Sequence, residues 1–118
     1  MKILVVEDEP YHMMLMTTIL KYYGHDCIEA FTGAEGIEET FDSKPDIVLM
    51  NLMLPDIYGF EATRKIREIM KDIPIIAVTS YSMDEVREKI IKAGFNGLIQ
   101  KPINPGTIMD EIKKIVFL

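Results

Sequence analysis

The sequence contains only one cysteine and two histidines, and it has no long apolar stretch. Cys27 cannot form a disulfide within the chain, and no cluster of Cys and His residues has zinc spacing, which suits a reducing compartment. Neither a signal-peptide core nor a run of about 20 apolar residues occurs. We therefore expect a cytoplasmic protein in which Cys27 is a buried thiol.

Positive charge is also scarce. Lys and Arg number 13 against 19 Asp and Glu, which gives a formal net charge of -6 at pH 7. A field of this sign repels nucleic acid and anionic membrane surfaces, so we expect no direct contact with nucleic acid and no membrane association. His12 and His25 form no convincing catalytic pair, which leaves a histidine-based hydrolase as a remote alternative.

The 118 residues, 48% of them hydrophobic, suffice for one domain with a sizeable core but not for two. Five short apolar runs alternate with segments of helical periodicity, which predicts a doubly wound α/β domain with a parallel sheet covered on both faces. The predicted domain spans residues 1–118. The predicted strands are residues 2–6, 26–31, 46–51, 74–78 and 96–100.

Helices are predicted between these strands from caps and apolar spacing. Thr32 with Glu35 and Ser82 with Glu85 form capping boxes, and Asn104 is the predicted cap of the last helix, with Pro105 at its first position. Apolar residues at helical spacing predict the inward faces, and a methionine stripe there indicates core packing rather than a cofactor site. The inward-facing set for the first three helices is Met13, Met16, Ile19, Leu20, Tyr23, Ala34, Ile37, Phe41, Thr63, Ile66, Ile69 and Met70.

Polar side chains follow four of the predicted strands. Glu7 and Asp8 follow the first strand, Asn51 ends the third, and Thr79 and Lys101 follow the fourth and fifth. A switch in strand order near the first strand brings the carboxyl ends of strands one and three together. Glu7, Asp8 and Asn51 are therefore predicted to share one crevice, flanked by Thr79 and Lys101.

This combination suits phosphoryl transfer. Two adjacent acids repel each other unless a hard cation such as magnesium lies between them, and a hydroxyl and a lysine can hold phosphate oxygens. Taken singly, each feature has an ordinary explanation: a solvated loop for Glu7 and Asp8, a helix-approach turn for Thr79, and a surface lysine for Lys101. Their joint placement at strand ends favours the functional interpretation.

Together these residues resemble the receiver domain of two-component response regulators. The resemblance covers essentially the whole chain, because its motifs occur in the family order at the ends of strands one, three, four and five. It implies a flavodoxin-like fold with strand order 2-1-3-4-5, of the single-domain type or excised from a longer protein. The matching motifs are Val6-Glu7-Asp8-Glu9-Pro10, Asp46-Ile47-Val48-Leu49-Met50-Asn51 with Leu54-Pro55 and Gly59, Val78-Thr79-Ser80, and Lys101-Pro102.

The resemblance also implies a magnesium site. Glu7 and Asp8 match the acidic pair that holds the ion, and the backbone carbonyl of Met53 matches the position that completes the site. Asn51 falls on the phosphoacceptor aspartate, where an amide cannot form an acyl phosphate. Because Asn51 also removes one negative charge, we expect a weakened metal site and an equilibrium toward the inactive arrangement.

The remaining matched positions belong to the switch of the family. Thr79 matches the hydroxyl that follows the phosphoryl group, and Lys101 matches the lysine that pairs with that group, with a cis peptide bond expected before Pro102. Leu98 occupies the position of an aromatic switch side chain, which puts aromatic-to-hydroxyl coupling in doubt. Tyr58 replaces a common loop aspartate, a minor departure.

The function implied is a signalling module rather than an enzyme. A histidine kinase or phosphotransfer protein would supply the phosphoryl group to an aspartate at position 51, and a downstream protein would bind the last two helices and the strand between them, residues 96–100. Asn51 blocks this chemistry. The retained Glu7, Asp8, Thr79 and Lys101 favour an engineered acceptor substitution over a natural pseudo-receiver that serves as an interaction module without phosphorylation.

A flavin or nucleotide-binding protein of similar topology is a further alternative. Such a protein needs a phosphate cradle rich in Gly, Ser or Thr after the first strand. Glu7-Asp8-Glu9 stands there instead and would repel a phosphate in the absence of metal.

Overall fold

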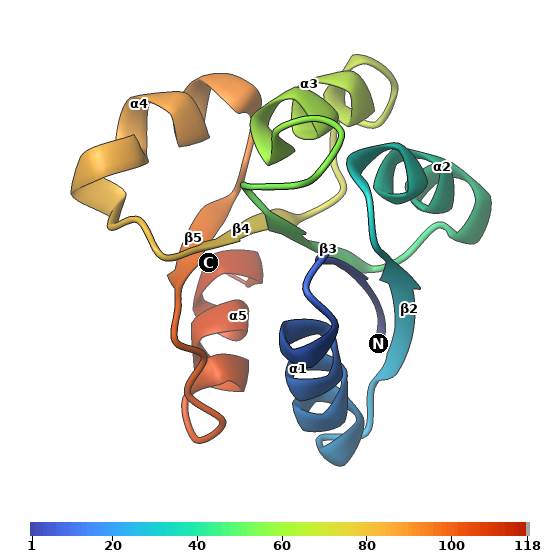
Figure 1. The fold of residues 1–118 in the computed structure, drawn as a ribbon, viewed down its shortest axis with the longest axis vertical. Helices are drawn as coiled ribbons and strands as arrows, with labels where there is room; N and C mark the ends of the chain where they lie inside the picture. Colours follow the sequence, from blue (N-terminus) through green and yellow to red (C-terminus); the bar gives the residue numbers. More distant parts are fainter. Residues whose placement is uncertain (118) are drawn as a thin grey trace.

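Five parallel strands form one sheet through the centre of the molecule (Figure 1). The structure is a computed structural model and describes residues 1–117. The strands follow the order β2-β1-β3-β4-β5, as predicted, and each agrees with its predicted range to within one residue at either end. They are β1 Lys2–Val6, β2 Asp26–Ala30, β3 Ile47–Asn51, β4 Ile75–Thr79 and β5 Gly97–Gln100.

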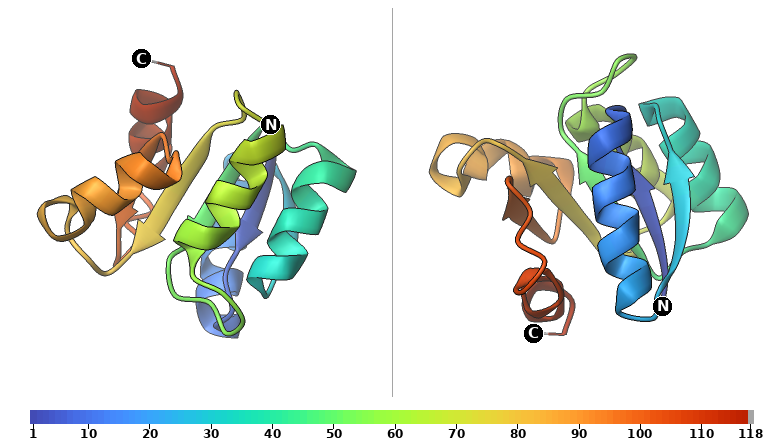
Figure 2. Two further views of the ribbon diagram at one scale, coloured as in Figure 1. Left: turned by 90° about the horizontal axis from the view of Figure 1, so that it is seen from above. Right: turned by 60° about the horizontal axis from the view of Figure 1, so that its bottom comes forward.

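Five helices cover the two faces of the sheet. Helices α1 and α5 lie on one face and α2, α3 and α4 on the other (Figure 2). This arrangement confirms the doubly wound α/β fold with a flavodoxin-like strand order. The helices are α1 Pro10–Tyr22, α2 Gly33–Ser43, α3 Gly59–Ile69, α4 Met83–Ala93 and α5 Ile108–Val116.

Alternate residues of the central strands supply two separate cores. On β1, Leu4 and Val6 face the core beneath α3 and α4, whereas Ile3 and Val5 face the core beneath α1 and α5. Both faces are covered, and β3 and β4 are buried throughout. The near-continuous apolar strands are therefore explained by burial on both sides.

Two predicted core positions, Tyr23 and Ile69, are wrong. Tyr23 is 44% exposed and Ile69 is 71% exposed. Each follows the last fully buried side chain of its helix, Leu20 or Ile66, by three residues and lies at the edge of the apolar stripe rather than at its centre. The Tyr23 hydroxyl instead donates a hydrogen bond to the Pro105 carbonyl at 2.9 Å, which links the end of α1 to the turn before α5.

Helix α2 matches its predicted inward face only in part, because Ile37 packs against the core beneath α3 and α4 but Ala34 does not. Ala34 is exposed, whereas Gly36 and Thr40 are buried. A Cβ added at Gly36 would lie 2.8 Å from Cγ2 of Val6, so the glycine allows the helix to approach β1 closely. The approach of the helix backbone, rather than an apolar side chain, fills this part of the core.

The last helix begins later than predicted. Its first residue is Ile108, not Pro105. The Asn104 side chain accepts a hydrogen bond from the Gly106 N–H at 2.9 Å, and its carbonyl accepts one from the Ile108 N–H at 3.0 Å. Asn104 therefore caps a turn that precedes the helix, a common alternative role for this residue type.

Several other local predictions are confirmed. Thr32 caps α2 through the Glu35 N–H at 3.0 Å, and Ser82 and Glu85 form the capping box of α4. The Lys101–Pro102 peptide bond is cis.

Cys27 is half-buried rather than fully buried as predicted, because β2 is an edge strand. Desolvation raises the pKa of its thiol. In the part of the chain that the structure describes, no helix has both the length and the apolar character needed to span a membrane.

Candidate functional site

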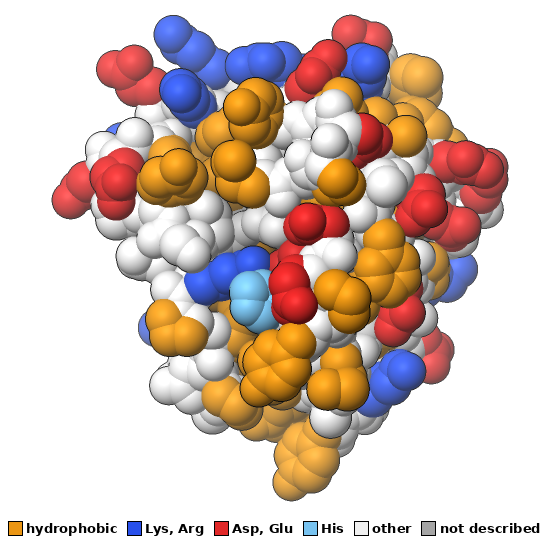
Figure 3. All heavy atoms as spheres, viewed as in Figure 1, with side chains coloured by type: hydrophobic (Ala, Val, Ile, Leu, Met, Phe, Trp, Pro, Cys, Tyr) orange, Lys and Arg blue, Asp and Glu red, His pale blue; other side chains and the backbone are white. Residues whose placement is uncertain are grey.

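The carboxyl ends of the strands meet at one edge of the sheet, where the predicted residues gather. Val6 of β1 pairs with Met50 of β3, so Glu7, which follows β1, and Asn51, the last residue of β3, lie side by side. In the space-filling view of Figure 3, acidic side chains, a histidine and basic side chains adjoin one another near the middle of the face that is shown. A polar pocket of about 390 Å³ lies at this edge, and its lining includes Glu7, Asp8, Asn51, Met53, Thr79 and Lys101.

Asn51 lies at the centre of the acidic side of this pocket. Asn51 is buried, with only 8% of the residue exposed to solvent. The amide Nδ2 donates to Oε2 of Glu7 at 3.0 Å and to the Met53 carbonyl at 3.0 Å, and it lies 3.4 Å from Oδ1 of Asp8. One NH₂ group is thus surrounded by three oxygen acceptors, all predicted as metal ligands.

Glu7 is the most heavily bonded side chain of the site. It is 5% exposed, and its Oε1 accepts a hydrogen bond from Nζ of Lys101 at 2.7 Å. Its Oε2 also accepts from the Glu9 N–H at 3.1 Å. Burial opposes the charged form, but the Lys101 ammonium and the Glu9 N–H outweigh it and hold the pKa of Glu7 below its usual range. Glu7 is therefore an ionised, buried carboxylate.

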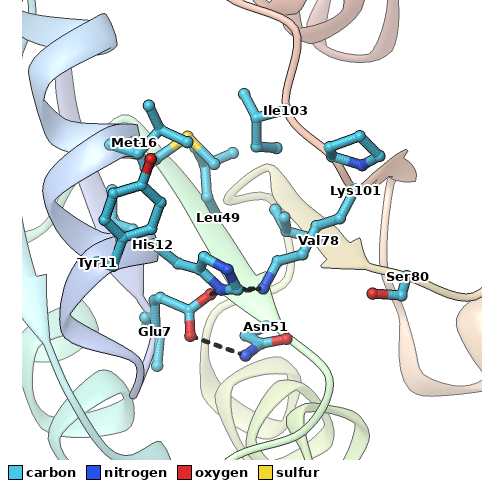
Figure 4. A pocket seen from close by; sticks show the side chains of 14 residues that line it. Glu7, Tyr11, His12, Met16, Leu49, Asn51, Val78, Ser80, Lys101 and Ile103 are labelled. Carbon is cyan, nitrogen blue, oxygen red and sulfur yellow. Dashed lines mark hydrogen bonds and ion pairs between the residues drawn. The ribbon is translucent and has the colours of Figure 1, made fainter.

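Lys101 and His12 complete the cluster that Figure 4 shows. The Lys101 side chain is 16% exposed and points to Glu7, whereas the family resemblance paired it with a phosphoryl group at position 51. His12 is in the first turn of α1. Its Nδ1 atom lies 3.3 Å from Nζ of Lys101 and 3.7 Å from Oε1 of Glu7. Sequence reasoning missed His12 as a member of the site; its place just after the acidic residues was the only signal.

The other side of the pocket is more sparsely bonded. Thr79 ends β4 and is 3% exposed, and its hydroxyl accepts a hydrogen bond from the Tyr81 N–H at 3.2 Å. Within residues 1–117, that hydroxyl makes no hydrogen bond to Asn51 or Lys101. Leu98, on β5, lies half-buried against the core beneath α3 and α4. The absence of aromatic-to-hydroxyl coupling at this position stays a prediction.

The loop after β3 is held against the strand end by Gly59. The Gly59 N–H donates to the Leu52 carbonyl at 2.8 Å. A Cβ at this position would collide with the backbone carbonyl of Asn51, so only glycine fits here without a shift of the backbone. This close approach fixes the loop that carries the Met53 carbonyl.

Asp56 anchors the same loop to a distant helix. Its two carboxylate oxygens accept hydrogen bonds from the Gly33 N–H at 2.8 Å and the Ala34 N–H at 2.9 Å, at the beginning of α2. Desolvation favours the neutral form, but the backbone donors together outweigh it and lower the pKa of Asp56. Sequence reasoning missed this contact because no local pattern links the two segments.

Tyr58, which replaces a common loop aspartate of the family, lies in the same loop. It is 60% exposed, and its side chain does not cap α3.

Only some of the side chains at this edge of the sheet suit a magnesium ion. Glu7, Asp8 and the Met53 carbonyl supply hard oxygens, the ligand type that Mg²⁺ prefers. Asn51, however, directs an NH₂ donor into these oxygens, and Lys101 occupies the remaining oxygen of Glu7. Among residues 1–117, no three His, Cys, Asp or Glu side chains are arranged to hold a metal ion. In this arrangement, the residues therefore do not fit the ion that the resemblance implied.

A larger cavity adjoins the polar cluster. Its volume is about 480 Å³, and it lies between α1 and the segment that follows β5, with Glu7, Asn51 and Lys101 at its polar end (Figure 4). The rest of the cavity is mainly apolar. The apolar lining includes Val5, Leu15, Met16, Leu49, Val78 and Ile103.

Comparisons with known proteins agree with this geometry. The polar-differentiation response regulator DivK of Brucella ovis is 31% identical over 113 residues, which cover 94% of this chain and 92% of DivK. A CheY-like response regulator receiver domain protein of Methanospirillum hungatei has a TM-score of 0.90 at 28% identity, over 98% of this chain and 93% of that one.

A third relative is the receiver domain of the sensor histidine kinase PA1611 of Pseudomonas aeruginosa, whose structure contains a magnesium ion coordinated in the active-site cleft. It has a TM-score of 0.89 at 27% identity and covers 99% of this chain and 98% of that one. The family model described as the response regulator receiver domain matches residues 3–113. The chain therefore belongs to the response regulator receiver domains of two-component systems.

Proposed function

We propose that this chain is a two-component signalling module whose phosphoacceptor step is blocked by Asn51. The observation that carries the proposal is the position of Asn51 at the end of β3, inside a pocket that also contains Glu7, Asp8, Thr79 and Lys101. The parent chemistry is magnesium-dependent transfer of a phosphoryl group from a histidine kinase or phosphotransfer protein to an aspartate at this position. The chain itself acts as a signalling protein and not as an enzyme.

The block follows from the chemistry of the amide. A carboxylate oxygen is a nucleophile toward phosphorus, whereas the nitrogen of an amide is not. Asn51 also carries no charge and turns its NH₂ group toward Glu7. Magnesium binding is accordingly weaker than in an aspartate-bearing site, and the protein stays in its unphosphorylated arrangement.

The proposed downstream surface is formed by α4, β5 and α5. Ile91 on α4 is 68% exposed, and Tyr81, just before α4, is 45% exposed, so apolar area is available there for a protein partner. The net charge of -6 argues against nucleic acid or an anionic membrane as the direct partner. A cytoplasmic location stays a prediction from the sequence.

Phosphorylation of a restored aspartate tests the proposal. This protein, Asn51→Asp and Asn51→Gln are incubated with magnesium and a small acyl-phosphate donor, and their intact masses are compared. We expect one phosphoryl group on Asn51→Asp, none on the other two, and none on Asn51→Asp when EDTA removes the metal. A failure of Asn51→Asp to gain the group would refute the parent chemistry, and a gain by this protein would refute the block.

A second candidate is a constitutive interaction module. It is favoured by the fact that Asn51 and Lys101 each donate a hydrogen bond to Glu7, so both are bonded without a phosphoryl group. Under this alternative, partner binding is the same for this protein and for Asn51→Asp, with or without phosphodonor. Codon 51 of the encoding gene distinguishes an engineered substitution, which the retained Thr79 and Lys101 favour, from a natural one.

A further inference from the structure

We infer that the side-chain amide of Asn51 takes the place of the divalent cation in this receiver, so that the acidic site is held together without metal. In a site of this kind a cation links two carboxylates and a backbone carbonyl. Here Nδ2 of Asn51 contacts that same set: Glu7 at 3.0 Å, Met53 at 3.0 Å and Asp8 at 3.4 Å. The NH₂ group is the bridging positive end of a dipole among three acceptors.

The surrounding acceptors determine which way the amide points. Carboxylate and carbonyl oxygens cannot donate hydrogen bonds at neutral pH, and the NH₂ group has two hydrogens to give. The opposite orientation would place Oδ1 of Asn51 against the oxygens of Glu7 and Met53 and would leave two acceptors without this donor. The pairing is therefore selected by chemistry: two hydrogen bonds of ordinary length are made to Glu7 and Met53, with Asp8 at a longer distance.

The charges around the amide lead to the same conclusion. With an aspartate at position 51, three carboxylates would converge at this edge, and only Lys101 would offset them. Carboxylates this close raise one another's proton affinity unless a cation separates them. Asn51 removes one of the three charges and adds two donors, while Lys101 neutralises Glu7 at 2.7 Å. The Asp8 carboxylate is then the one negative charge beside the amide that no cation offsets, so a metal ion would have less charge to neutralise here than in a site with an aspartate at position 51.

Metal binding would instead disturb this arrangement. A cation among the same oxygens requires the NH₂ group of Asn51 to turn away, which breaks its hydrogen bonds to Glu7 and Met53 in a residue only 8% exposed. A buried polar group that loses its partners is costly. Millimolar Mg²⁺ is therefore expected to leave the stability of this protein unchanged. The inference rests on the receiver identity of the site and not on phosphoryl transfer.

The first experiment compares thermal unfolding of this protein and Asn51→Asp in EDTA and in increasing Mg²⁺ and Mn²⁺. We expect this protein to show the same Tm throughout and to exceed Asn51→Asp in EDTA. Asn51→Asp should gain about 5 °C once the metal concentration is ten times its dissociation constant. A metal-dependent rise in this protein equal to that of Asn51→Asp would overturn the inference.

A matched variant separates the hydrogen bonds from the loss of charge. Asn51→Leu is also uncharged and similar in size, but it has no donor for Glu7 or Met53. We expect it to be insensitive to metal like this protein, yet to unfold at a lower Tm in EDTA. If Asn51→Leu equals or exceeds this protein in Tm, the amide donors contribute nothing and the inference is wrong.

Nuclear magnetic resonance provides a readout of the amide itself. The side-chain NH₂ signals of Asn51, assigned by their absence in Asn51→Asp, should be protected from exchange and unaffected by Mg²⁺ or Mn²⁺. Broadening of these signals by millimolar Mn²⁺ would contradict the inference. Phosphorylation of Asn51→Asp is scored separately by mass, so a failed phosphotransfer proposal and a failed cation-replacement proposal give different results.

Discussion

The two halves of the site differ in how completely their polar groups are bonded. The acid half, after β1 and β3, comprises Glu7, Asp8, Asn51 and Met53, and every one of these residues contributes an atom to the contacts around Nδ2 of Asn51. The switch half, at the end of β4 and on β5, comprises Thr79 and Leu98. There, the Thr79 hydroxyl accepts one hydrogen bond of 3.2 Å from its own loop.

Lys101 accounts for much of this difference. It follows β5, on the switch side of the sheet, but its ammonium lies across the pocket on Glu7 at 2.7 Å. A phosphoryl group at position 51 would compete for this ammonium, and none forms on an amide. The acid half is therefore held together by contacts within the chain, whereas the side chains of Thr79 and Leu98 make no hydrogen bond to Asn51 within residues 1–117.

The largest effect is expected from Glu7→Gln, which breaks the acid half. The substitution leaves the Lys101 ammonium, 16% exposed, without its carboxylate, and removing one partner of a buried pair is strongly destabilising. We expect the free energy of unfolding to fall by about 3 kcal/mol, measured by urea unfolding. The double variant Glu7→Gln/Lys101→Met should lose less than the sum of the two single losses. A gain in stability would show instead that repulsion between Glu7 and Asp8 dominates.

Acid should weaken the same half to a smaller extent, because a protonated Glu7 keeps its size and part of its hydrogen bonding. The pKa of Glu7 is lowered on folding, so the folded state binds fewer protons than the unfolded state in this range. The stability that Glu7 supplies is complete above the pKa of an unfolded glutamate and is lost as pH falls through the lower, folded value. Urea unfolding below about pH 5 should show a steeper loss for this protein than for Glu7→Gln. Equal slopes would contradict a role for this carboxylate.

A moderate effect is expected from Asp56→Ala, which releases the loop next to the acid half. Asp56 satisfies two N–H groups at the start of α2, and loss of a helix cap costs about 1 kcal/mol. Amide hydrogen exchange should rise at Gly33 and Ala34 and in the loop around Met53. Asp56→Asn, which keeps one acceptor, should show a smaller change; an unchanged exchange rate in both variants would mean that the loop is held by Gly59 alone.

The smallest effect is expected in the switch half from Thr79→Val. This change removes one neutral hydrogen bond to the Tyr81 N–H and keeps a β-branched side chain suited to a strand. The expected loss is about 0.5 kcal/mol, measured by the same urea unfolding. A loss as large as that of Glu7→Gln would abolish the contrast between the two halves.

The fold and the membership of the site could be predicted because both depend on local patterns. Apolar runs such as residues 74–78 are typical of strands buried on both faces, and polar residues that follow parallel strands must meet at one edge. Glu7, Asn51 and Thr79 were found in this way. Tyr23, Ala34 and the beginning of α5 were predicted wrongly because helical spacing alone does not tell where a stripe ends, how closely a helix approaches the sheet, or which competing turn Asn104 caps.

By itself, the sequence determined the alternation of strands and helices, the residues at the strand ends and the presence of an amide rather than a carboxylate at position 51. Only the tertiary structure decided which of these residues bond to one another. Lys101 and Glu7 are separated by 94 residues, and Asp56 and Ala34 by 22. Local periodicity carries no information about such pairs. They are selected when the packed sheet brings buried donors and acceptors together, because each must find a partner once water is excluded.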